Sequence, residues 1–220
     1  MQSKHRTDMS KLHEAFKTFE TWVEANGAIN EEELNPEFKK LAEELIFGGH
    51  IVVDKRFHIY IRTVEFYFHQ ENEGIKDPIV YHRNGKVPGF PQEIEVPYFP
   101  MMAVHGHPSG YDITFESGEQ KYRASALIRK YSVFDSQKKV FIAKDDERST
   151  FLYYYLNGFS IIEDGKNNNF WKEKSAPGPH ELNNPKPRRN VKKYIGEVRQ
   201  KENDLRPWSY SAKGELGTIE

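Results

Sequence analysis

The stretch FHIYIRTVEFYFH, at residues 57–69, decides how this chain folds. β-Branched and aromatic side chains fill it, and such residues favour a β-strand. Because successive side chains of a strand point to opposite faces, every second residue from Ile59 to Tyr67 is predicted to share one face. The Glu65 carboxylate is thereby placed in a row with Ile59 and Ile61, and this row is expected to face the core.

Glu65 needs compensation in such a row, because a buried carboxylate without a partner loses its hydration at a cost of several kcal/mol. Three outcomes satisfy this requirement: Glu65 pairs with a cation, it holds a proton, or it lines a cavity that opens to water. The first outcome is a structural ion pair. The last is an acid or base in a pocket, with Tyr67 as part of the wall.

Arg129 is the candidate partner of Glu65. Residues 122–134 form another predicted strand, in which every second side chain from Arg123 to Arg129 shares one face. A carboxylate and a guanidinium on adjacent strands can simply pair. They can also hold a water molecule between them and let the carboxylate take its proton, which is general-base hydrolysis.

The composition narrows the class of protein. The chain has 32 lysines and arginines against 33 aspartates and glutamates, so it lacks the overall basic charge that marks many nucleic-acid-binding proteins. It has no cysteine, which excludes disulfides, cysteine-ligated zinc and thiol catalysis and agrees with a cytoplasmic location. No run of about 18 apolar residues occurs, so no membrane partner is expected. No obligate protein partner is inferred.

Two helices are expected before the central strand. Apolar residues recur at three- and four-residue steps over residues 10–26, and Gly27 follows as a stop signal. A second helix is predicted to start at Asn35-Pro36, with the asparagine as cap and the proline at the first helical position, and to end at Gly48.

Further strands are predicted at residues 51–53 and 104–115. Helices followed by several strands indicate an α+β fold, with a curved, mostly antiparallel sheet or partial barrel and helices packed on its outside. We expect an N-terminal helical extension at residues 1–34 and a single domain at residues 35–220.

The C-terminal segment from residue 186 to residue 206 holds most of the local basic excess. A run of this kind forms either a solvated face or a patch that contacts phosphates. Its basic residues are Lys186, Arg188, Arg189, Lys192, Lys193, Arg199, Lys201 and Arg206.

A histidine pair offers a different chemistry. His105 and His107 are two positions apart, as in a strand that projects both side chains to one side, and Asp112 follows. With Asp112 or Glu65 as an oxygen ligand they could chelate a metal ion. The alternative is that both histidines are surface or hydrogen-bonded side chains, and we expect no bound metal.

Several blocks resemble, in order, the alkyladenine (3-methyladenine, methylpurine) DNA glycosylase family. LAEELIFG at residues 41–48 is similar to the turn that ends its first core helix, and RTVEFY at 62–67 shares the Glu-x-Tyr of its catalytic strand. DPIVYHRN at 77–84 resembles its acidic residue, histidine and Arg-Asn. The interval from Gly110 to Arg129 and the closing LRPWSY at 205–210 are also similar to the family.

The resemblance implies a base-excision repair enzyme that flips an alkylated purine out of DNA and hydrolyses its N-glycosidic bond without a cofactor. Glu65 would be the general base that activates water, and Arg129 would hold that water and Glu65. Tyr67 would stack on the extruded base. His82 would hydrogen-bond the base or nearby backbone, and His105 falls where the family has another stacking ring.

The same resemblance implies DNA, damaged or single-stranded, as the partner. The DNA-binding residues would come from the basic segment, and we expect them to be Arg188, Arg189, Lys192 and Lys193.

Two departures from the family alter the expected substrate. Ser109 stands where the family has a tyrosine that wedges into duplex DNA, so single-stranded or bulged sites are expected to be the better substrates. Glu116 stands where the family has a pocket asparagine, and a carboxylate facing a base would change the choice of base. Two other functions stay open: a catalytically silent nucleic-acid or nucleobase-binding module, and a metal-dependent hydrolase using His105 and His107.

Overall fold

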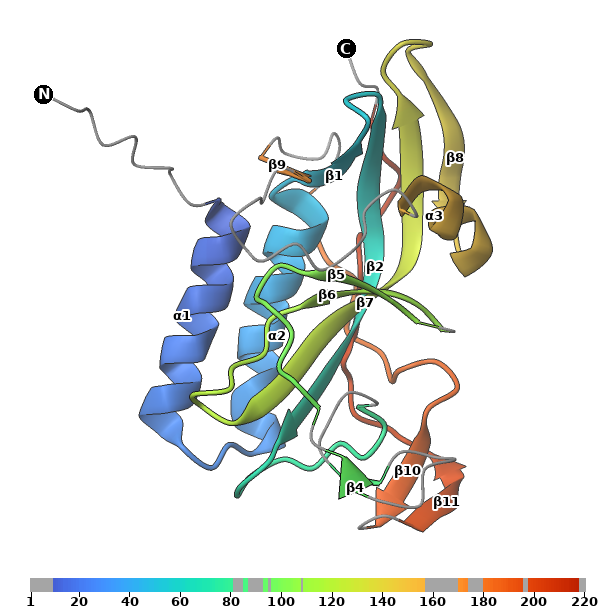
Figure 1. Cartoon of the computed structure of the whole chain (residues 1–220). Helices are drawn as coiled ribbons and strands as arrows, with labels where there is room; N and C mark the ends of the chain where they lie inside the picture. The colour runs from blue at the N-terminus through green and yellow to red at the C-terminus, as the bar shows by residue number, and fades with distance from the viewer. Residues whose placement is uncertain are drawn as a thin grey trace, which may run out of the picture.

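The computed structural model describes residues 10–80, 85–86, 93–94, 96–107, 109–156, 170–173, 180–195 and 198–217. These residues form an α+β fold in which a curled, antiparallel half-barrel sheet packs against helices, as predicted (Figure 1). The described helices are α1 (Lys11–Asn26), α2 (Glu31–Phe47) and α3 (Ser149–Leu156). Helices α1 and α2 stand side by side against the sheet, and α3 packs on β6.

The large sheet is built around two long strands, β2 (Phe57–Gln70) and β7 (Tyr122–Asp135). Its strand order is β5-β6-β7-β2-β1-β9, while β12 also pairs with β2 and β8 also pairs with β7. The shorter members are β1 (His50–Val53), β5 (Val104–His107), β6 (Gly110–Thr114), β8 (Val140–Asp146), β9 (Trp171–Lys172) and β12 (Ser209–Ser211). Two hairpins lie outside it: β3 (Gly85–Lys86) with β4 (Glu93–Ile94), and β10 (Lys192–Ile195) with β11 (Val198–Asn203).

The strand predicted over residues 104–115 is in fact an antiparallel pair, β5 and β6. The chain reverses before Gly110, whose φ of 143° lies in a region that glycine adopts readily. A single long strand would have kept His105 far from Asp112, but the reversal places these two residues opposite each other.

Helix α1 has the predicted limits because both ends are capped. The Ser10 hydroxyl accepts a hydrogen bond from the His13 backbone N–H at 3.2 Å. Gly27, with φ of 65°, ends the helix and donates its N–H to the carbonyl of Val23.

The predicted start of helix α2 is wrong. Asn30 and Glu33 form a capping box that begins the helix at Glu31, so Pro36 lies inside it. The end at Gly48 is confirmed. Asn35 is instead used in packing: its side-chain oxygen accepts a hydrogen bond from the Trp208 indole N–H at 3.0 Å.

One aromatic core joins both N-terminal helices to the sheet. The ring of Phe16 on α1 stacks on Phe115 with centroids 4.8 Å apart, and Phe38 on α2 stacks on Phe66 of β2 at 4.4 Å. The expected domain boundary after residue 34 lies inside α2, and residues on both sides of it enter this core.

Two β-bulges face each other where β2 pairs with β7. Ile61 pairs with Tyr131 but Thr63 with Lys130, which leaves Arg62 as an extra residue on β2. The next pair, Val64 with Ile128, leaves Arg129 as an extra residue on β7. A bulge re-aims the side chain of the extra residue and bends its strand.

The bulges overturn the predicted alternation along β2. Ile59 and Ile61 enter the same core as Val64 and Phe66, because the extra residue shifts the faces by one position. Glu65 is therefore not in a row with the two isoleucines. It lies on the face of β2 that is turned away from α1 and α2.

Candidate functional site

A cleft of about 610 Å³ lies on the face of the sheet opposite the two N-terminal helices. One wall consists of side chains from β2, β6 and β7, and the other consists of the chain around and within β10 and β11. The lining comprises Tyr67, Ile79, Val80, Ser109, Asp112, Ser125, Leu127, Arg129, Arg189, Asn190, Val191, Lys192, Tyr194 and Arg199.

Glu65 lies beneath this lining and is held by three donors. The Arg129 Nε–H donates to Oε2 at 2.6 Å, and the Tyr67 hydroxyl donates to the same oxygen at 3.3 Å. The Arg189 backbone N–H donates to Oε1 at 2.7 Å. Only 1% of Glu65 is exposed. The prediction that Glu65 and Arg129 lie close together is thus confirmed, through direct contact.

The protonation of the neighbours of Glu65 follows from this geometry. Burial and the negative charge of Glu65 raise the pKa of the Tyr67 hydroxyl well above its usual value, so it stays a hydrogen-bond donor. Burial alone would lower the pKa of Arg129, but the attraction of Glu65 outweighs it and the pKa is raised. Arg129 therefore stays charged beside the carboxylate.

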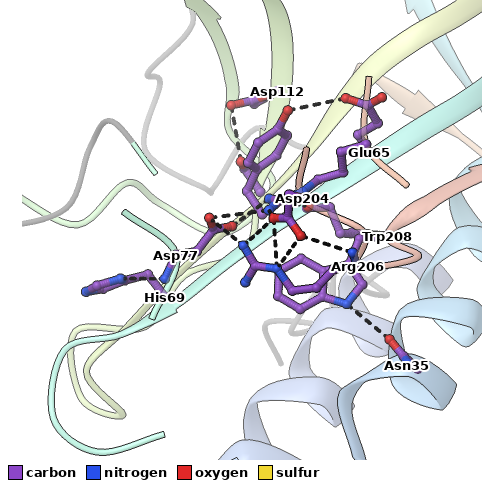
Figure 2. Close-up of polar contacts among 12 residues, drawn as sticks. Asn35, Glu65, His69, Asp77, Asp112, Asp204, Arg206 and Trp208 are labelled. Carbon is purple, nitrogen blue, oxygen red and sulfur yellow. Dashed lines mark hydrogen bonds and ion pairs between the residues drawn. The ribbon is translucent and has the colours of Figure 1, made fainter. Parts of the chain in front are cut away.

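Asp112 is an acidic residue of the cleft lining, although the sequence suggested it only as a metal ligand. Its Oδ2 accepts a hydrogen bond from the Ser125 hydroxyl at 3.1 Å. Glu65 and Asp112 are both register partners of Leu127, so they lie in one row across three strands (Figure 2). Two strand spacings separate their backbones by about 10 Å. The alternation in β6, where Tyr111 and Ile113 are buried on the other face, is the signal that could have revealed this position.

The histidines that the sequence suggested as site residues are not found beside Glu65 in the described part of the chain. The His105 ring is half-buried and lies 4.4 Å from the ring of Phe99, and it is not among the described lining of the cleft. His82 and the His107 side chain lie outside the described residues. Within the described part of the chain, no three His, Asp or Glu side chains are grouped so that they could hold a metal ion.

Ser109 and Glu116 differ in where they lie. Ser109 lines the cleft. Glu116 does not face a base site: it is buried, accepts a hydrogen bond from the Phe99 backbone N–H, and lies 3.8 Å from the buried guanidinium of Arg123. The expectation that Glu116 enters the pocket is therefore wrong, because Arg123 and the segment before β5 hold it elsewhere.

Arg188 is buried in an ionic network and is not a surface contact for phosphate. Its guanidinium donates to Asp77 and to Asp204, at 2.6 Å in each case. Arg206 donates to both aspartates as well, at 3.2 Å to Asp77 and 2.5 Å to Asp204 (Figure 2). Arg188 is 3% exposed, so the two carboxylates compensate a guanidinium charge that has lost its hydration.

The network fixes one wall of the cleft. The Arg188 guanidinium lies over the rings of Tyr67 and Trp208, 4.7 and 4.9 Å from their centroids. Trp208 is anchored in turn on Asn35 of α2 (Figure 2). Because Arg189 follows Arg188 directly, its backbone N–H is brought to Glu65 by this packing.

The other basic residues of the segment are divided between the cleft and the outer surface. Arg189, Lys192 and Arg199 line the cleft. Lys193, the neighbour of Lys192 on β10, is exposed and is not in the described lining. Alternation along β10 therefore separates two lysines that the sequence interpretation treated alike.

The network predicts acid sensitivity at Asp204. Burial opposes ionisation, but hydrogen bonds from Arg206 and the charge of Arg188 prevail and lower the pKa to about 2. An unfolded aspartate titrates near pH 3.9. The stabilisation is therefore complete above about pH 4 and is lost as the pH falls towards about 2. The melting temperature of the wild type should fall more steeply over this pH interval than that of Asp204→Asn. Equal slopes of melting temperature against pH would contradict the assignment.

No helix in the described ranges is long and apolar enough to cross a membrane. No protein-family model matches the chain, and comparisons with curated proteins and with solved structures find no match.

Proposed function

We propose that this protein hydrolyses the N-glycosidic bond of an alkylated purine nucleotide in DNA, with Glu65 as the general base. The observation that carries the proposal is the buried Glu65–Arg129 pair directly beneath a cleft with aromatic and cationic walls. The proposal agrees with the resemblance to the alkyladenine DNA glycosylase family in the block that contains Glu65 and Tyr67.

The chemistry requires a carboxylate near the sugar. When the bond from C1′ to the base nitrogen breaks, its electrons leave with the base and positive charge develops on the sugar. Glu65 stabilises this charge and takes a proton from the water that attacks C1′. A carboxylate has about four acceptor positions and the described residues supply three donors to Glu65, so a further position can accept a hydrogen bond from that water.

The walls of the cleft suit a flipped nucleotide. Tyr67 and Tyr194 offer aromatic surfaces on which a base can stack, which recovers part of the free energy of unstacking it from DNA. Four cationic residues, Arg129, Arg189, Lys192 and Arg199, outnumber the acidic residue of the described lining, Asp112. Their charge favours a ligand that carries phosphate.

A catalytically silent nucleobase-binding module is the second candidate. It is favoured by the same 1% exposure of Glu65, since three donors and burial also describe a structural ion pair. Incubation with single- and double-stranded oligonucleotides carrying an alkylated purine separates the two functions. Release of the base supports the glycosylase, whereas binding without release favours the silent module.

Lys192 and Lys193 test the position of the DNA-binding surface. Lys192→Gln is expected to weaken binding to single-stranded DNA about fivefold at 0.1 M salt, because one lost phosphate contact lowers the salt slope by about 0.7. Lys193→Gln removes the same charge from the outer side of β10 and should change the affinity by less than about twofold. Fluorescence anisotropy measures both affinities, and equal losses would place the DNA on another surface.

A further inference from the structure

A second hollow, of about 330 Å³, adjoins the cleft. Arg129 and Arg189 line both spaces, so the Glu65 site lies where they meet. Thr63, two residues before Glu65 on β2, also lines the second hollow. The described residues that line it are Arg62, Thr63, Arg129, Lys130, Asp145, Glu147, Asn183, Lys186, Arg189, Ser209, Ser211, Ala212 and Gly214.

The two facing bulges build this hollow. Arg62 and Arg129, the extra residues of β2 and β7, both line it. Arg62 is 4% exposed and is held by Asp145 at 3.1 Å and by the Gly214 carbonyl. The bulges thus place two guanidiniums on one side of the sheet, at a place where regular pairing would have separated them.

The hollow carries a local positive charge although the chain as a whole has a net charge of −1. Five of its lining residues are cationic and two are acidic. Glu147 pairs with Arg189 at 2.6 Å and with Lys130 at 3.2 Å. Lys186 is exposed, and the described residues provide it with no ion pair. Hydroxyl groups of Thr63, Ser209 and Ser211 add neutral donors.

We propose that this hollow binds the phosphodiester adjoining the nucleotide whose base enters the cleft, with Lys186 as its principal contact. The inference rests on the proposed function and gives the phosphate beside the reacting sugar a binding site of its own, which a free nucleoside would leave empty. A sugar placed against Glu65 would bring its neighbouring phosphate towards Arg129 and Arg189, which line both spaces. The adjoining hollow offers that phosphate cations and hydroxyl donors, which are the groups that bind phosphate oxygens.

The experiment compares two probes on the full chain, a short single-stranded oligothymidylate and thymidine, which carries no phosphate. Lys186→Gln is expected to weaken oligothymidylate binding about fivefold at 0.1 M salt and to reduce the salt slope by about 0.7. Its affinity for thymidine should stay unchanged, because that ligand has no phosphate to place in the second hollow. Lys213→Gln is the control, since Lys213 is 57% exposed, pairs with Glu181 and lines neither space.

The outcomes separate this inference from the proposed function. Equal losses of oligothymidylate affinity in Lys186→Gln and Lys213→Gln, or an equal loss for both probes in Lys186→Gln, would overturn the role of the second hollow. If the wild type excises no base but the Lys186-dependent affinity is present, the phosphodiester site stands and the glycosylase function fails. If excision occurs and Lys186→Gln changes neither affinity nor salt slope, the glycosylase function stands and this inference fails.

Discussion

Glu65→Gln is expected to lower the single-turnover rate of base release by on the order of a thousandfold. The amide keeps an oxygen that can accept from Arg129, but it can neither take a proton from water nor stabilise positive charge on the sugar. The measurement is release of an alkylated purine from a single-stranded oligonucleotide under enzyme excess. Thermal melting of the variant checks that the fold is retained.

Glu71→Gln is the matched control for Glu65→Gln. Glu71 also pairs with a buried arginine, since Arg123 donates to it at 2.8 Å, but it lies outside the described lining of the cleft. Its substitution should leave the rate within about threefold of the wild type, as expected for a position that touches no reacting group. Similar losses in both variants, or an unchanged rate in Glu65→Gln, would mean that Glu65 serves only as a structural ion pair.

Arg188→Met should have the largest effect on stability. Removing one partner of a buried ion network costs about 3–5 kcal/mol, because charges that have left water lose their compensation. Among the described residues, Arg206 would be the remaining cation that contacts Asp77 and Asp204. For a chain of this size such a loss corresponds to a fall in melting temperature of roughly 10 °C. Differential scanning calorimetry measures it directly.

Arg189→Met is the natural comparison, because Arg189 is the next residue and carries the same charge. Its side chain is 58% exposed and pairs with the half-exposed Glu147, and such surface pairs contribute about 0–1 kcal/mol. A melting temperature that falls equally in both variants would contradict the structural role assigned to Arg188. A large fall in melting temperature in Arg188→Met alone would also support the view that the packing of Arg188 brings the Arg189 backbone to Glu65.

The fold class and the central pair could be predicted from sequence because both depend on local patterns. The strand character of residues 57–69 follows from its own side chains, and the limits of α1 follow from a serine cap and a glycine stop. A buried carboxylate within such a strand needs a cationic partner, and this requirement predicted the pairing of Glu65 with Arg129.

Register across strands could not be predicted, because it depends on how two distant segments pair. The bulges at Arg62 and Arg129 each add one residue to a ladder, which is visible only when β2 and β7 are aligned. They move Glu65 from the predicted core row to the cleft face. The same pairing places Asp112 in line with Glu65 and builds the second hollow.

Burial of charge was likewise decided by tertiary structure alone. In the sequence, Arg188 and Arg189 are equivalent members of one basic run, but Asp77, 111 residues before Arg188, takes one of them into the interior. Sequence patterning thus determined which residues form the strands and that Glu65 needs a cation. The tertiary structure decided which basic residues face the cleft, because the free energy of burying a charge depends on partners that only the complete fold brings together.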